Sequence, residues 1–84
     1  MAPRFSLRQL EYMVAVAECG SVLSASKEVN VSSSSISAAI SQLEAELGVQ
    51  LFVRQHARGL NLTSVGRQFF TEAKQILHNV ALLS

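Results

Sequence analysis

Cysteine, proline and glycine are scarce in this 84-residue chain, which has one cysteine, one proline and four glycines. A single cysteine cannot form an internal disulfide framework, and its isolation is typical of a reducing compartment. Few prolines and glycines favour helix, because these residues interrupt helices most strongly. No apolar segment resembles a signal peptide or is long enough to span a bilayer. We therefore expect a cytoplasmic protein that does not contact a membrane.

Charge is also scarce, since the net charge of +1 is too small by itself to indicate nucleic-acid binding. The distribution of charge is more informative than its sum. Residues 47–71 contain three arginines and no acid, whereas residues 29–43 contain no charge of either sign. The hydrophobic fraction of 49% is high enough for a core and argues against disorder. A chain of this size forms one domain.

The sequence lacks a recognisable catalytic or metal-binding set. The serines have no adjacent activating base, so no nucleophile, base and orienting group can be named. His56 and His78 have no partners at the spacing of metal ligands. We therefore expect neither an enzyme, nor a metal site, nor a cofactor in these residues.

Capping residues predict two helices in the first third of the chain. Ser6 followed by Gln9 is a capping-box pattern, and apolar residues then recur at i, i+3, i+4 and i+7 until a glycine can end the helix. Ser21 can cap a second helix over residues 22–29, and Asn30 can end it in the left-handed conformation.

Four consecutive serines begin at Ser32, and they could be a serine-rich linker or the start of a third helix. The apolar residues that follow lie within roughly 60° of one another at about 100° per residue, a register that a linker has no reason to keep. These residues are Ile36, Ile40, Leu43 and Leu47. We therefore predict a helix over 33–47 with Ser32 as its N-cap.

A basic hairpin is predicted after this helix. Two short β-like runs, at 51–53 and 60–62, have Gly59 at the bend between them and carry Arg54 and Arg58. Two short helices across a tight turn are the unit that places a helix in the DNA major groove. A basic hairpin just after them suits contact with phosphates or the minor groove.

The outward face of the third predicted helix is small and uncharged. It consists of Ser34, Ala38, Ser41 and Ala45, flanked by Ser37 and Gln42. A solvated helix face usually carries charges, whereas small side chains allow close approach to another surface. Serine hydroxyls can bond to base edges and alanine can touch a thymine methyl group, so DNA is one interpretation. Packing on another protein is the other.

Thr63 can cap a last helix from Ser64 onward, which carries an apolar seam close to the heptad period. The seam consists of Val65, Phe69, Ala73, Ile76, Val80 and Leu83, widened by Leu77 and Leu82. We expect Val65 and Phe69 to pack on the body of the domain. The C-terminal part of the seam would be exposed in a monomer, which predicts a dimer contact.

These features come in an order that resembles the N-terminal domain of a LysR-type transcriptional regulator. The matching stretches are residues 7–10, 14–18, 20–21, 31–32, 36–37, 40, 43–44, 46–48, 51–54, 58–59, 62–63 and 66. They cover nearly the whole chain at the family's spacing. The family usually has Gln at the position of Ser33, often Pro at Ser34 and commonly a basic residue at Ala38. These differences leave the preferred DNA sequence unpredicted.

The resemblance implies a mainly α fold, with a winged helix-turn-helix of three helices and a two-stranded β wing in residues 1–63 and a long linker or dimerisation helix in residues 64–84. It implies a nucleoid-associated homodimer that binds an interrupted inverted repeat of double-stranded DNA, and a higher oligomer is open for the full-length protein. The recognition helix, about 33–47, would enter the major groove, and the wing, about 51–62, would contact the backbone or minor groove. A small-molecule effector is expected to bind a C-terminal domain outside these residues.

From the residues and the resemblance together we predict two sets of contacts. The predicted DNA contacts are Arg8, Ser21, Ser32, Ser33, Ser34, Ser37, Ala38, Ser41, Arg54 and Arg58. The predicted dimer contacts are Phe69, Ala73, Ile76, Leu77, Val80 and Leu83. The alternative function is a winged-helix domain whose uncharged third helix binds another protein.

Overall fold

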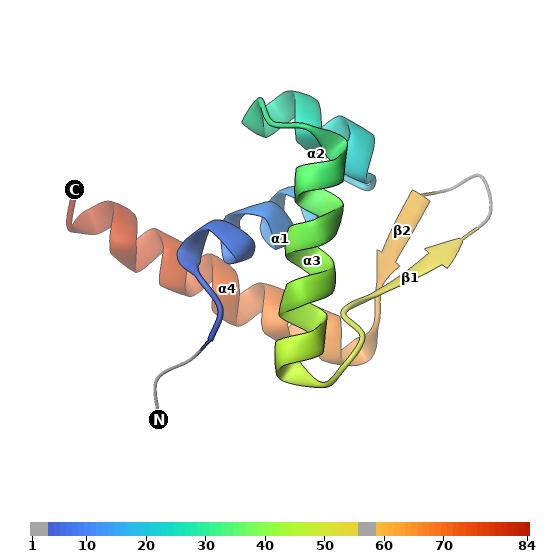
Figure 1. Ribbon diagram of the computed structural model, residues 1–84. Helices are drawn as coiled ribbons and strands as arrows, with labels where there is room; N and C mark the ends of the chain where they lie inside the picture. Colours follow the sequence, from blue (N-terminus) through green and yellow to red (C-terminus); the bar gives the residue numbers. More distant parts are fainter. Residues whose placement is uncertain (1–3, 56–58) are drawn as a thin grey trace.

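Four helices and one antiparallel hairpin make up the computed structural model, which describes residues 4–55 and 59–84. Figure 1 shows the hairpin and the C-terminus at opposite ends of the molecule. In chain order the elements are α1 (Leu7–Cys19), α2 (Val22–Val29), α3 (Ser33–Leu47), β1 (Phe52–Gln55), β2 (Gly59–Leu62) and α4 (Ser64–Leu82). This confirms the predicted mainly α fold with a two-stranded wing.

Hydroxyl side chains begin all four helices. Ser6 accepts a hydrogen bond from the backbone N–H of Gln9, whose side chain accepts one from the Ser6 N–H, which completes the capping box. Ser21, Ser32 and Thr63 each accept the backbone N–H three residues ahead. Each cap satisfies an N–H group that has no partner within the helix. The predicted starts of the helices are therefore confirmed.

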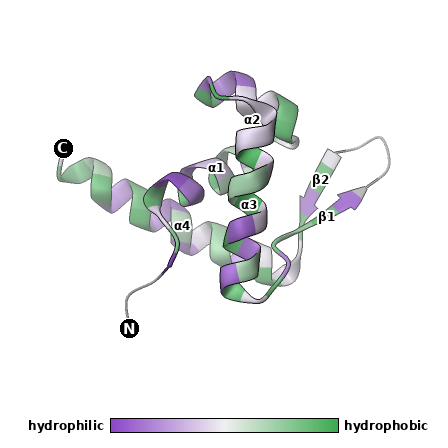
Figure 2. Cartoon of the chain, in the orientation of Figure 1, coloured by the Kyte–Doolittle hydropathy of each residue, from purple (hydrophilic) through white to green (hydrophobic). Residues whose placement is uncertain are grey.

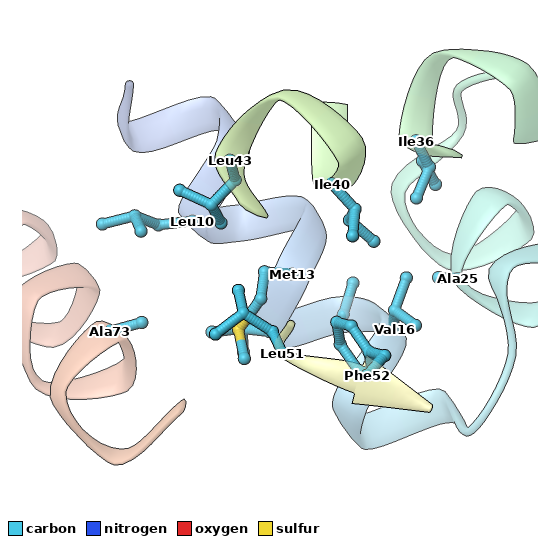
Figure 3. Close-up of a cluster of buried hydrophobic side chains, with 12 residues drawn as sticks. Leu10, Met13, Val16, Ala25, Ile36, Ile40, Leu43, Leu51, Phe52 and Ala73 are labelled. Carbon is cyan, nitrogen blue, oxygen red and sulfur yellow. The ribbon is translucent and has the colours of Figure 1, made fainter. Parts of the chain in front are cut away.

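The hydrophobic core lies between α1, α3 and the start of the wing. Figure 3 shows Met13 and Val16 of α1 together with Ile36 and Leu43 of α3 and Leu51, the residue before β1. Each of these side chains is fully buried. On α2 the buried apolar side chain is the small Ala25, which lets this helix approach α3 closely.

The wing differs from its prediction by one or two residues. β1 runs to Gln55, and Gly59 pairs with Gln55 inside the ladder instead of forming the bend. Gly59 has φ +80, and a Cβ atom there would lie 2.3 Å from the carbonyl oxygen of Gly20. The next residue, Leu60, donates its N–H to that same oxygen at 3.1 Å. Gly59 is therefore required by the close approach of β2 to the turn between α1 and α2.

The first half of α4 packs on α1. Ala73 is 1% exposed, and Lys74 Nζ lies 2.9 Å from a carboxylate oxygen of Glu18. The prediction for Val65 was wrong, because its side chain is 45% exposed. The face of α4 that meets the domain is centred on Gly66, one residue further along, where a Cβ atom would lie 2.1 Å from the Leu51 carbonyl oxygen.

The second half of α4 extends past the body of the domain, and Figure 2 shows hydrophobic residues along it. The exposed apolar side chains there include Ile76, Val80 and Leu83. None of the helices within residues 4–55 and 59–84 is long and apolar enough to cross a membrane.

Candidate nucleic-acid interface

The turn between α2 and α3 is held by a chain of hydrogen bonds. Asn30 is left-handed with φ 61, and the Val31 N–H bonds to the Ser26 carbonyl oxygen at 3.1 Å. The Ser33 hydroxyl donates to Ser26 Oγ at 3.3 Å, and the Ser26 hydroxyl donates to the Leu23 carbonyl oxygen at 2.7 Å. The two helices of the helix-turn-helix are thereby fixed relative to each other.

The outward face of α3 is exposed and carries no charged side chain. Its members are Ser34, Ser37, Ala38, Ser41, Gln42 and Ala45. The Ser34 hydroxyl lies 3.2 Å from the hydroxyl of Ser32, the N-cap. Since these side chains are short, the backbone of α3 can come close to a partner surface, and the hydroxyls can donate or accept hydrogen bonds.

A groove separates α3 from the wing, and Arg54 lies in it. One part of it, a hollow of about 250 Å³, has Ile40 and Phe52 in its lining together with Ser37, Ser41 and Arg54. A second hollow, lined by Arg54, Ser37 and Ser21 among others, continues the groove towards the N-terminus of α2. The structure therefore brings five of the predicted DNA contacts to one groove, namely Ser21, Ser33, Ser37, Ser41 and Arg54.

The wing is tied to α3 by a carboxylate that sequence reasoning did not single out. Glu44 Oε2 accepts the backbone N–H of Leu51 at 2.7 Å and that of Phe52 at 3.3 Å. Charge-assisted hydrogen bonds of this kind are stronger than neutral ones. A signal was present in the sequence, because Glu44 is the first charged residue after the uncharged stretch 29–43.

The first turn of α1 lies beside α3. Gln9 Nε2 donates to Gln42 Oε1 at 3.3 Å, a contact between residues 33 positions apart that no local pattern predicts. The neighbouring Arg8 is exposed. The outward face of α3 therefore has Arg54 on its wing side. On its other side is the first turn of α1, which carries the exposed Arg8.

Among the described residues, no three His, Cys, Asp or Glu side chains come together as metal ligands. The surface around α3 instead combines hydroxyls, amides and arginines, which are groups that bind phosphates and base edges.

Comparison with known proteins identifies the family of this chain. The model of the bacterial regulatory helix-turn-helix proteins of the lysR family matches residues 7–67, which is more than half of the chain. The chain belongs to the LysR family. LysR proteins are transcriptional regulators and not enzymes, in agreement with the lack of a catalytic set in the sequence.

Two curated LysR relatives illustrate how much of the protein this chain covers. The regulator TcbR of Pseudomonas sp. (strain P51) is 46% identical over 70 residues, which is 83% of this chain and 24% of TcbR. The regulator ClcR of Pseudomonas putida is 44% identical over 71 residues, which is 84% of this chain and 24% of ClcR. The chain thus spans about a quarter of the length of these relatives.

Solved LysR structures share the fold. The chain matches the crystal structure of a CbnR DBD–DNA complex with a TM-score of 0.87 and 42% identity, over 92% of this chain and 87% of that one. It matches a complex of the BenM DBD with benA site 1 DNA with a TM-score of 0.88 and 35% identity, over 94% and 91% of the two chains. The predicted LysR winged-helix fold is confirmed.

The predicted DNA contacts of this LysR chain are not all free to point outward. Ser33 stands where the family usually has Gln, and its hydroxyl is half-buried and bonded to Ser26 instead of pointing outward. The hydroxyl of Ser32 is engaged in capping α3. Arg58 lies outside the described residues.

The six predicted dimer contacts of this LysR chain fall into two groups. Phe69, Ala73 and Leu77 pack against the hydrophobic core, and the Phe69 ring meets the Phe5 ring edge-on with centroids 6.3 Å apart. Ile76 and Val80 are 42% and 36% exposed, and Leu83 is 88% exposed. The second group is free to meet a partner, whereas the first is largely covered by its own domain.

Proposed function

We propose that this chain is the sequence-specific, double-stranded DNA-binding module of a LysR-type transcriptional regulator, with α3 in the major groove. The observation that carries the proposal is the outward face of α3, exposed and uncharged, with the exposed Arg8 on α1 and Arg54 in the groove on the wing side. The matched CbnR and BenM domains were solved as complexes with DNA, which supports it. These two matches give no support to the alternative of a protein-binding winged helix.

On this proposal the small side chains of α3 read base edges at short range. Ser34, Ser37 and Ser41 offer hydroxyls that can donate to or accept from bases, and Ala38 offers a methyl group that suits a thymine methyl. Arg54 binds the DNA backbone from the wing side of the groove. Its charge adds affinity that does not depend on base sequence.

Ser21, Ser32 and Arg8 would support the backbone contacts. Ser21 and Ser32 are the N-caps of α2 and α3, where free backbone N–H groups and the helix dipole favour phosphate. Arg8 is exposed in the first turn of α1, beside α3. Arg58 belongs to the same proposed set on the strength of its place in the wing sequence.

We further propose that the chain acts as a homodimer through α4. Ile76, Val80 and Leu83 form an exposed apolar stripe on the part of α4 that leaves the body of the domain. Pairing two such stripes about a two-fold axis would bury them and present two α3 helices to an inverted repeat. Phe69, Ala73 and Leu77 would support the stripe from inside the domain.

For the whole protein, which is about four times longer in the relatives, we propose a regulator whose C-terminal domain binds a small-molecule effector. It would act in the cytoplasm on the nucleoid, as a dimer or a higher oligomer.

Selection of bound sequences from a random DNA pool tests the DNA-binding proposal, with the wild-type chain and an Ala38→Arg variant compared. We expect the wild type to select an interrupted inverted repeat. Ala38→Arg should raise general affinity and shift the selected base nearest to this position towards guanine, because arginine pairs with guanine O6 and N7. Enrichment of no motif by the wild type, or the same motif from both chains, would contradict the placement of α3 on DNA.

A further inference from the structure

Two glutamine side chains form a relay from the start of α1 to the outward face of α3. The backbone N–H of Ser6 donates to Gln9 Oε1 at 2.8 Å. The amide nitrogen of Gln9 then donates to Gln42 Oε1 at 3.3 Å. The capping box of α1 is thereby connected to a residue of the proposed DNA-reading helix.

The direction of this relay is fixed by chemistry. A backbone N–H can only donate, so the Gln9 atom that meets Ser6 must be the carbonyl oxygen. The NH₂ group of Gln9 therefore faces Gln42, and because NH₂ can only donate, Gln42 must present its carbonyl oxygen to it. The NH₂ group of Gln42 is left as the free end of its side chain.

Gln42 is placed where this free end can meet DNA. It is exposed and lies one helical turn after Ala38, so both side chains share one side of α3. Within residues 4–55 and 59–84, its side chain makes no hydrogen bond besides the one with Gln9. Both hydrogens of its NH₂ group remain available to an external acceptor.

We propose that Gln42 contacts DNA as a hydrogen-bond donor only, and that Gln9 is the positioning residue that imposes this role; the inference rests on the proposed DNA binding. A free glutamine offers a donor and an acceptor together and pairs with adenine N7 and N6. The bond from Gln9 orients the Gln42 amide with its oxygen towards α1 and its NH₂ group as the outer end, so Gln42 instead matches a group that only accepts. Guanine O6 and N7 are such groups in the major groove, and phosphate oxygens are such groups on the backbone.

The variant Gln9→Glu reverses the relay without removing the capping box. The new carboxylate can still accept the Ser6 N–H, since glutamate is a usual capping-box residue. It cannot donate, so Gln42 must turn its NH₂ group towards the carboxylate and its oxygen towards DNA. The DNA position that Gln42 contacts should then favour a base that donates, such as adenine or cytosine, over guanine.

The effect is measured as relative binding to DNA sites that differ only at the position that Gln42 contacts. Four proteins are compared: wild type, Gln9→Glu, Gln42→Ala and the double variant. We expect Gln9→Glu to change the guanine-to-adenine preference by about 3- to 10-fold, the range expected for one hydrogen bond. In the Gln42→Ala background the same substitution should change no preference. The added negative charge acts in both backgrounds, so comparing them removes its contribution.

The outcomes distinguish the sources of the acceptor. If Gln42 meets a phosphate, Gln9→Glu should lower affinity for all sequences, and by several-fold more when Gln42 is present than when it is alanine. Equal effects of Gln9→Glu in both backgrounds would overturn the inference while leaving DNA binding by the wild type intact. A wild type that selects no sequence would overturn the proposed function itself. Equal thermal unfolding midpoints of the four proteins show that the comparison is one of folded domains.

Discussion

Glu44 of α3 holds the start of the wing through the backbone N–H of Leu51, which donates to its carboxylate at 2.7 Å. The same oxygen accepts the Phe52 N–H. The wing therefore keeps its position relative to α3 through a side chain of α3 itself. The groove that contains Arg54 depends on this connection, because Glu44 and Arg54 line the same hollow.

Glu44→Ala should destabilise the domain. The substitution leaves two part-buried backbone N–H groups without their acceptor, which costs about 1–3 kcal/mol per unsatisfied group. Glu44→Gln is the matched control, because it retains a carbonyl oxygen of the same reach, and its loss should be clearly smaller. Urea denaturation of the three proteins measures the difference. Equal stabilities of Glu44→Ala and Glu44→Gln would show that the carboxylate does not hold the wing.

Arg54→Ala should weaken binding to all DNA sequences in similar proportion. Each lost phosphate contact lowers the slope of log affinity against log salt concentration by roughly 0.9. Arg67→Ala is the control, since Arg67 lines a different hollow, with Val53 on the opposite face of the hairpin. A titration with salt measures both variants. If Arg54→Ala leaves the slope unchanged, Arg54 does not contact phosphate, and a changed base preference would indicate reading of the minor groove.

Ile76→Glu combined with Val80→Glu should convert dimers into monomers. Both side chains lie on the exposed stripe of α4, and pairing would bury like charges without partners. Helical content should remain, because neither residue belongs to the core. His78→Glu places one charge on the opposite side of α4, since His78 is exposed and two residues from both Ile76 and Val80, and it should leave the dimer intact. Sedimentation decides between these results, and a double variant that stays dimeric would move the interface to another face.

Local features of the fold could be predicted because they depend on neighbouring residues. A serine or threonine N-cap accepts the backbone N–H three residues ahead, and Asn30 and Gly48 adopt the left-handed conformation that ends a helix. The start and end of α3 were therefore accessible from the sequence. The serine run at its start was assigned correctly because the apolar register of the following residues requires a helix.

The orientation of α4 could not be predicted in the same way. Its apolar residues form two stripes side by side, one facing α1 and one facing solvent, and a single near-heptad seam cannot separate them. The choice depends on Gly66, whose lack of a side chain permits contact with the Leu51 carbonyl. That contact joins residues from different elements and leaves no local pattern. Val65 was assigned to the wrong side for this reason.

Parts of the candidate site were hidden for a related reason. The exposed face of α3 and the place of Arg54 follow from periodicity. The engagement of Ser33 with Ser26 and the bond between Gln9 and Gln42 depend instead on how helices cross. A hydroxyl or amide can face a base or a neighbouring helix, and the sequence alone does not distinguish these partners.

The burial of Ala73 and the packing of Leu77 bear on how regulators of this kind can be recombined. The first half of α4 covers one side of the core. A chimera whose junction lies before residue 77 would therefore replace residues that contact the core as well as the appended domain. A donor helix would have to reproduce the glycine at position 66 and the alanine at position 73, because larger residues there meet backbone or α1. Chimeric regulators that keep this chain intact through Leu77 should inherit its folding. Those that keep it through Leu83 should also retain the proposed dimer stripe and with it the inverted-repeat target.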